Sequence, residues 1–200
     1  MTSVDRAVGA VVSGVSETVR TWTLVALVMF LLNLVAFAGF SVAGGVWFTV
    51  SDALGFVLAA SMVPVMVGMD RLVRPGVGDP ARVARIIGVT GMAVVMAGSI
   101  VLLTSEVSHE FVPAGGGLGM QFAGFGLEGV WFLLMGRLAS RTGIYSSRLA
   151  VVCYVIGAGF LVGATGAAFG PDSIGVMVGM TLSSFGFIAW AVMSRRQIGG

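Results

Sequence analysis

The chain contains no lysine, one cysteine, one histidine and few charged residues of either sign. Without a lysine amine, neither retinal nor pyridoxal phosphate can be held as a Schiff base. The lone Cys153 cannot form an intramolecular disulfide, and a single thiol in an apolar run packs as a small hydrophobe. The lone His109 excludes bis-histidine haem and histidine-rich zinc sites, and it argues against Ser/His hydrolysis within a membrane.

Motifs for other common chemistries are absent or out of place. The sequence has no phosphate-binding loop and no dinucleotide fingerprint. Gly76-Val-Gly-Asp79 matches the GxGD string of intramembrane aspartyl proteases, but it lies in an arginine-rich loop just before a proline. Glu106, His109 and Glu110 could ligate a metal, yet a solvated acidic loop explains them more simply. We therefore expect no metal, no cofactor and no enzyme, with a lipid-modifying enzyme as the remaining catalytic alternative.

The scarcity of charge also indicates the class of fold. Of the 200 residues only 10% are charged and 57% are hydrophobic, and the mean hydropathy is +1.02. A soluble domain has about 25% charged residues, so lipid must surround most of this chain. Because each membrane-crossing helix needs about 20 apolar residues, the sequence predicts an all-α integral membrane bundle. Its six predicted spans are 21–43, 46–69, 84–104, 116–136, 148–168 and 174–194.

All eleven basic residues are arginines, and they occur only in alternate connections. They precede the first span, lie between spans two and three and between spans four and five, and follow the sixth. Arginines near span ends are retained in the cytoplasm. We therefore predict a bacterial cytoplasmic (inner) membrane protein with both termini in the cytoplasm. Among its arginines, Arg71, Arg74, Arg82 and Arg85 are the predicted contacts with lipid headgroups.

The predicted domain organisation is a single six-span domain over 21–196 and a short cytoplasmic tail at 197–200. Valines at helical spacing predict a cytoplasmic amphipathic segment over residues 1–20. Its charges cancel, so it should bind lipid weakly. Its expected contact is either the bundle's own cytoplasmic face or a partner protein.

Local signals predict where several helices begin and how they pack. Asp79-Pro80 is typical of a helix start, Ser147 can cap the fifth span, and Asp172 or Ser173 can cap the sixth. Small residues recur every four positions at Gly159, Gly163 and Ala167 and at Gly175, Gly179 and Ser183. Such faces let helices approach closely in lipid. They predict internal packing of one bundle or, alternatively, contact with a protein partner or a second copy.

Three spans end alike. Arg71, Arg137 and Arg195 each follow a methionine-containing apolar stretch, and Trp131 and Trp190 lie six and five residues before their arginines. This similarity predicts three helical hairpins, which either share an ancestor or converge on the same interface chemistry.

Glu128 is the strongest candidate for a functional residue. It lies nine residues before Arg137, which is about 13 Å along a helix and near the predicted middle of the membrane. A carboxylate at that depth is costly and normally faces the bundle interior. Gly117, Gln121 and Gly124 share its helix face. Glu128 is therefore either a proton or ligand site or a neutral, hydrogen-bonded acid that fastens helices together.

Two further polar residues are weaker candidates. Asp52 lies a few residues inside the second span, or else Ser51-Asp52 caps a helix that starts there. Asn33, near the middle of the first span, either hydrogen-bonds Glu128 or joins helices in another way.

The last span closes in Trp190 followed by Arg195-Arg196. In this ending, in length and in span number, the chain resembles small uncharacterised six-helix bacterial integral membrane proteins, a resemblance that implies no activity. Two functions remain. One is a substrate- or ion-handling transporter, channel or binding bundle with Glu128 at its centre. The other is a non-catalytic membrane subunit or accessory protein that docks a partner. No nucleic-acid partner is expected.

Overall fold

The computed structural model describes residues 3–43, 46–108, 115–170 and 172–198. These residues form six α-helices and no strand: α1 (Ser3–Ala43), α2 (Val46–Val77), α3 (Asp79–Ser108), α4 (Gly115–Arg141), α5 (Ser147–Ala167) and α6 (Ile174–Gln197). All six described helices are long and apolar enough to cross a membrane. The all-α prediction is confirmed, and each predicted span falls on one helix.

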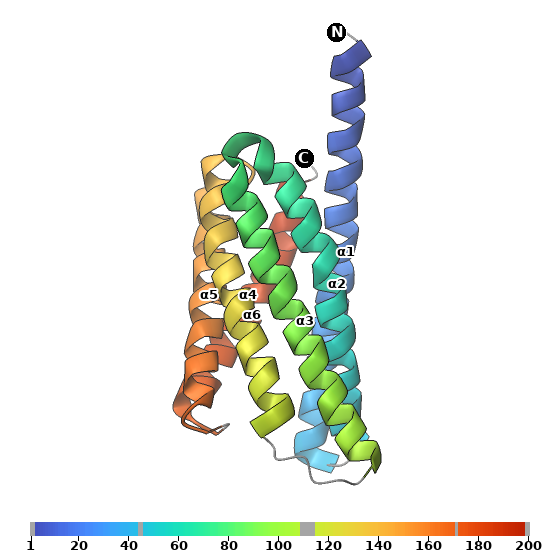
Figure 1. Ribbon diagram of the computed structural model, residues 1–200, viewed down its shortest axis with the longest axis vertical. Coiled ribbons are helices and arrows are strands. Elements are labelled where there is room, and N and C mark those ends of the chain that lie inside the picture. Colours follow the sequence, from blue (N-terminus) through green and yellow to red (C-terminus); the bar gives the residue numbers. More distant parts are fainter. Residues whose placement is uncertain (1–2, 44–45, 109–114, 171, 199–200) are drawn as a thin grey trace.

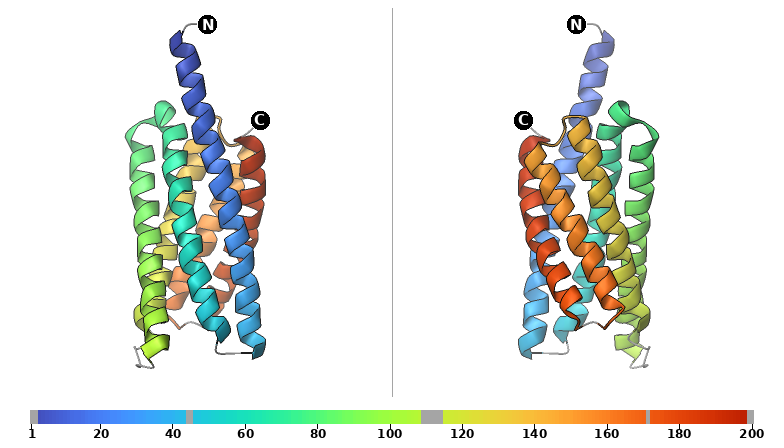
Figure 2. Two further views of the ribbon diagram at one scale, coloured as in Figure 1. Left: turned by 90° about the vertical axis from the view of Figure 1, so that its right-hand side faces the viewer. Right: turned by 90° about the vertical axis from the view of Figure 1, so that its left-hand side faces the viewer.

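The helices alternate in direction, so that α1 begins and α6 ends at the same end of the bundle (Figures 1 and 2). Each helix packs on the next along the chain, and α6 returns to α1 through a smaller contact. The most extensive contacts lie within the pairs α1–α2, α3–α4 and α5–α6. The helices therefore form a ring of three hairpins, while the common ancestry of the hairpins stays a prediction.

The end of the bundle where α1 begins also carries the α2–α3 and α4–α5 connections and the end of α6 (Figure 1). We call it the arginine end, because these connections and helix termini contain the arginines from Arg71 onwards. At the α2–α3 turn Gly78 has a φ of 69°, a left-handed conformation that glycine adopts without strain. α3 then begins at Asp79 with Pro80 in its first turn, as predicted. α5 is capped by Ser146 rather than by Ser147, and α6 by Ser173.

α1 is one continuous helix from Ser3 to Ala43, with no break between the segment 1–20 and the first predicted span. Its first turns extend beyond the other helices at the arginine end (Figure 1). Val19 is the first described side chain of α1 that is fully buried, and it packs against Gly68 of α2. The N-terminal segment therefore continues the direction of the span and does not fold across the end of the bundle.

Aromatic side chains fill the space enclosed by the six described helices. Trp131 and Trp190 meet edge to face with ring centroids 6.4 Å apart. The ring centroids of Phe30 on α1 and Phe187 on α6 lie 4.9 Å apart. This contact joins the first helix to the last. Edge-to-face geometry places the positive ring edge on the negative ring face and adds to the gain from burial. The middle of the bundle is thus a packed core to which α1, α4 and α6 contribute rings.

Small residues set the spacing of the last hairpin. A Cβ atom at Gly159 would lie 2.8 Å from the backbone nitrogen of Ser183, and one at Gly179 would collide with the backbone of Gly163. The helices α5 and α6 can approach this closely only because these positions lack side chains. The internal-packing interpretation of the two small-residue faces is confirmed.

Candidate functional site

A polar cluster joins α2, α3 and α4 in the half of the bundle away from the arginine end. Gln121 donates from Nε2 to Oδ1 of Asp52 at 3.2 Å and to Oγ of Ser99 at 3.0 Å. Asp52 is 8% exposed and Ser99 is fully buried. Buried polar groups are stable when they are hydrogen-bonded to one another. Gln121 therefore holds three helices together through a single amide.

Asn33 of α1 lies beside this cluster. Its Nδ2 donates to the backbone carbonyl of Ser51 at 2.7 Å, and Ser51 Oγ donates to Asn33 Oδ1 at 3.5 Å. A Cβ atom at Gly55 would lie 3.4 Å from Asn33 Nδ2 and 4.0 Å from Ser99 Oγ, so the two sets of bonds are neighbours. The alternative in which Asn33 hydrogen-bonds Glu128 is wrong, because the α1–α2 packing places its amide on Ser51.

Asp52 does not cap a helix. α2 begins at Val46, six residues earlier, so Ser51 and Asp52 lie inside the helix. The apolar residues 46–50 continue the helical packing against α1 and override the local capping signal. Asp52 therefore faces α4 as a buried side chain, which is the other alternative that the sequence allowed.

Glu128 lies two turns from Gln121 on the same face of α4, about 10 Å closer to the arginine end. Its side chain is 4% exposed. α3 approaches closely here, since a Cβ atom at Gly91 would lie 2.9 Å from the carbonyl oxygen of Gly124 and 3.2 Å from the backbone nitrogen of Glu128. Among the described residues, none forms a hydrogen bond or an ion pair with the Glu128 carboxyl. The structure therefore buries this acid without bonding it.

Trp131 follows Glu128 by three residues and shares its helix face. The indole Nε1 is buried and has no hydrogen-bond partner within the described part of the chain. A buried tryptophan N–H normally finds an acceptor. Residues three apart on a helix have Cβ atoms about 5–6 Å apart. Glu128 and Trp131 thus lie one turn apart on α4, and neither the carboxyl nor the indole N–H is bonded to a described residue; we call this pair the Glu128 site.

Asp70 is a buried acid that the sequence analysis did not single out. It is fully buried near the arginine end of α2. Arg74 binds both of its carboxylate oxygens, with Nε 3.1 Å from Oδ1, and Nη1 of Arg85 lies 3.1 Å from Oδ2. The i,i+4 spacing of Asp70 and Arg74 is visible in the sequence. The contribution of Arg85 is not, because it depends on the turn between α2 and α3.

This arrangement divides the four arginines predicted to contact lipid headgroups. Arg74 and Arg85 are engaged with Asp70, whereas Arg71 and Arg82 are exposed and bind no described acid. Contact with headgroups stays a prediction for all four. Of these four, Arg71 and Arg82 are the two that form no ion pair with a described acid.

Three buried acids mark successive levels of the described bundle. Asp52 and Asp70 are eighteen residues apart on α2, about 27 Å, which is close to the roughly 30 Å of a hydrocarbon core. Glu128 lies between these levels. Asp52 is hydrogen-bonded and Asp70 is ion-paired, so Glu128 alone of the three has no bonded partner among the described residues.

A second buried contact ties the α4–α5 connection to the bundle. Trp190 donates from Nε1 to the hydroxyl oxygen of Tyr145 at 3.2 Å, and this hydroxyl donates to Sδ of Met69 at 3.6 Å. Burial raises the pKa of the Tyr145 hydroxyl, so it remains a protonated donor. This chain of bonds links α6, the connection and α2, and it is a structural feature.

Metal ligation finds no support in the part of the chain that the structure describes, where no three His, Cys, Asp or Glu side chains are grouped to hold an ion. His109 and Glu110 lie outside the described residues. Cys153 is buried and free.

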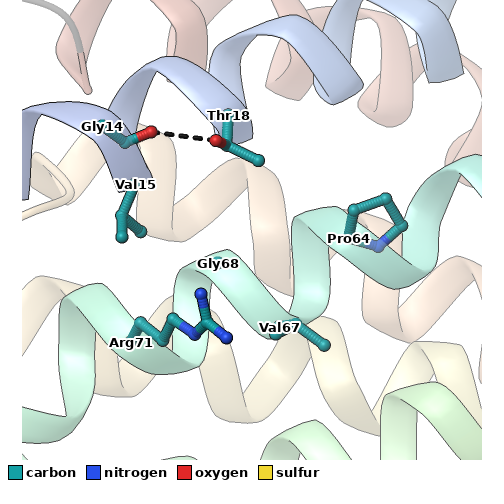
Figure 3. Close-up of a pocket in the computed structure, with 7 residues that line it drawn as sticks. All are labelled: Gly14, Val15, Thr18, Pro64, Val67, Gly68 and Arg71. Carbon is teal, nitrogen blue, oxygen red and sulfur yellow. Dashed lines mark hydrogen bonds between the residues drawn. The ribbon is translucent and has the colours of Figure 1, made fainter. Parts of the chain in front are cut away.

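A groove of about 370 Å³ lies between α1 and α2 toward the arginine end (Figure 3). Its walls are Gly14, Val15 and Thr18 of α1 and the face of α2 from Pro64 to Arg71. Glu128 is not among the lining residues.

No protein-family model, no curated protein and no solved structure matches the chain. The function therefore has to be inferred from the geometry of the bundle alone.

Proposed function

We propose that the chain is a multi-pass protein of a bacterial cytoplasmic membrane, with both termini in the cytoplasm, that takes up and releases a proton at Glu128. The alternation of arginine-rich and arginine-free connections supports the orientation. The length and apolar character of the six described helices support the membrane location.

The unbonded carboxyl of Glu128 is the observation that supports the function. A carboxyl that only fastens helices together has to be hydrogen-bonded, since an unsatisfied buried polar group costs about 1–3 kcal/mol. Glu128 is 4% exposed and forms no bond with any described residue. Groups that are expensive to bury inside a membrane mark proton or ion pathways. The helix-fastening alternative is therefore the weaker of the two.

A proton is the ligand that best fits the surroundings of Glu128. An organic substrate would require a cavity of about 300 Å³ or more, and the groove of about 370 Å³ between α1 and α2 is not lined by Glu128. A proton needs no cavity. The polar cluster around Gln121 and Asp52 lies two turns away toward the arginine-poor end, and the Trp131 N–H can stabilise the ionised carboxylate from the other side. Solute transport is correspondingly less well supported.

Proton flux into vesicles tests this function. The purified chain would be reconstituted with a trapped pH-sensitive dye, and a pH gradient would be imposed. We expect wild type to dissipate the gradient faster than empty vesicles, and Glu128→Gln to abolish the difference. Glu17→Gln, the same change at an exposed acid of α1, is the matched control and should behave as wild type. Equal flux from wild type and Glu128→Gln at every pH would refute the proposal.

Reporter fusions test the orientation separately. A reporter that is active only outside the cytoplasm should be silent after Arg196 and active when inserted near His109. The opposite pattern, or activity at both positions, would rule out the proposed topology.

A non-catalytic subunit is the second candidate, and the extension of α1 beyond the bundle favours it (Figure 1). In that case the first turns of α1 would dock a partner. Deleting residues 2–18 should then leave insertion intact and remove a protein that co-purifies with the full chain. If no protein co-purifies with the full chain from its own membrane, this candidate fails.

A further inference from the structure

The groove between α1 and α2 is separate from the Glu128 site, and its two ends differ in chemistry. From Pro64 to Arg71, α2 rises about 10 Å. Val15, Pro64 and Val67 supply apolar surface along this length, and Arg71 supplies the one charged group among the lining residues. In Figure 3 the Arg71 side chain lies against α2 near Gly68, and Val15 projects from α1 toward α2.

The charge of Arg71 is free to meet a ligand. Its neighbours in the sequence and across the turn, Arg74 and Arg85, are both engaged with Asp70. Arg71 forms no ion pair with any acid in the described ranges. The Thr18 hydroxyl donates to the carbonyl of Gly14 at 2.9 Å, so its proton is already used within α1. An anion in the groove would therefore be held by Arg71.

We propose that this groove binds one anionic phospholipid, with an acyl chain along Pro64 and Val67 and its phosphate on Arg71, opposite Val15. A guanidinium suits a phosphate because its planar N–H groups bind two oxygens at once. Along α2, Arg71 lies toward the arginine end of the groove and Pro64 and Val67 lie toward the middle of the bundle, which is the polarity of a lipid in that leaflet. A free phosphate would leave the apolar part of the groove unused.

The two halves of this site can be tested independently. A Cβ atom at Gly14 would meet nothing within 4 Å, so Gly14→Leu places a side chain in the groove without moving α1 from α2. Gly68 would be unsuitable, since a side chain there collides with Val19. Arg71→Gln removes the charge and leaves the apolar surface. Arg82→Gln removes an equally exposed arginine outside the groove and is the matched control.

The experiment is native mass spectrometry of the detergent-purified full chain, titrated with phosphatidylglycerol and, in parallel, with phosphatidylcholine of identical acyl chains. We expect wild type to prefer phosphatidylglycerol. Arg71→Gln should weaken its binding about fivefold, the factor equivalent to the roughly 1 kcal/mol that one basic residue contributes near an anionic lipid. Gly14→Leu should weaken binding of both lipids, and Arg82→Gln should match wild type.

Several results would overturn the proposal. Unchanged binding by Arg71→Gln would show that the phosphate lies elsewhere. An equal loss of binding in Arg82→Gln would show that the lipid responds to the overall positive charge of the surface and not to Arg71. Unchanged binding by Gly14→Leu would exclude the groove. Glycerol phosphate that competes as well as the intact lipid would show that the acyl chain contributes nothing. Because Gly14→Leu keeps every charge, the groove remains testable even if Arg71→Gln folds poorly.

Discussion

Asp70 and Glu128 are both acids buried in the same bundle, yet the chain treats them in opposite ways. Asp70 is fully buried and receives hydrogen bonds from Arg74 and Arg85. Glu128 is 4% exposed and receives none from the described residues. The side chains of both arginines are partly exposed, at 44% and 30%. The arginine end can therefore supply counter-charges, whereas the middle of the bundle cannot.

Under the proposed function, this difference separates an acid that holds the fold together from one that exchanges a proton. A paired carboxylate fixes the positions of the elements that pair with it, here α2 and the start of α3. An unpaired carboxyl has no such bonds to lose, so replacing it with an uncharged amide of the same shape should change the stability of the fold little. The comparison predicts that stability depends on Asp70 and that proton chemistry depends on Glu128.

Asp70→Asn should have the largest effect on stability. Removing one partner of a buried ion pair costs about 3–5 kcal/mol, and the partial exposure of both arginines places the expected loss near 3 kcal/mol. Unfolding in a denaturing detergent, monitored by tryptophan fluorescence, would measure it. The control Asp79→Asn changes an exposed aspartate at the start of α3. Asparagine caps a helix about as well as aspartate and Pro80 is kept, so the variant should lose well under about 1 kcal/mol of stability. Equal effects of the two variants would mean that the Asp70 ion pairs contribute no stability.

Gly91→Val should have the next largest effect, because it forces α3 away from α4 beside Glu128. The added Cβ atom would lie 2.9 Å from the carbonyl oxygen of Gly124, and overpacking of this kind costs about 1–3 kcal/mol. Gly119→Val is the control, since a Cβ atom there meets nothing within 4 Å. Thermal melting in mild detergent would show the difference. If Gly91→Val melts like the control, α3 and α4 are not in close contact at Glu128.

Gln121→Leu should have a smaller effect, of about 1 kcal/mol, because it removes two hydrogen bonds at about 0.6 kcal/mol each within a membrane protein. A double-mutant cycle with Asp52→Asn should show coupling between the two residues. A second cycle, between Asp52→Asn and Glu128→Gln, should be additive, since Gln121, the partner of Asp52, lies about 10 Å from Glu128 along α4 and Glu128 bonds no described residue. Coupling in the second cycle would contradict the separation of the polar cluster from the Glu128 site.

The sequence predicted the helices better than it predicted their contacts. Apolar runs and capping residues depend on neighbours in the chain, so the six helices and the start of α3 at Asp79 could be predicted. Gln121 and Asp52 could be singled out as polar residues in spans, but their bond joins positions 69 residues apart. The same limit explains Asn33, which bonds Ser51, and the role of Arg85 beside Asp70. Contacts between residues on different helices are specified by packing. Asp70 and Arg74 lie on one helix at i,i+4 spacing, so their pairing could be recognised in the sequence.

Glu128→Gln should have the smallest effect on stability and the largest on function. The amide keeps the shape of the side chain, and there is no hydrogen bond to a described residue for the substitution to break. The free energy of unfolding, followed by thermal melting, should therefore change by less than about 1 kcal/mol, the net contribution of one hydrogen bond. Infrared spectroscopy during a pH titration provides a readout that a structural role would not move. The difference between the pH-dependent spectra of wild type and Glu128→Gln should contain a carboxyl C=O component that titrates with pH, and Glu17→Gln should retain this component. A destabilisation as large as that of Asp70→Asn would mean that Glu128 is bonded after all, and the contrast between the two acids would then be lost.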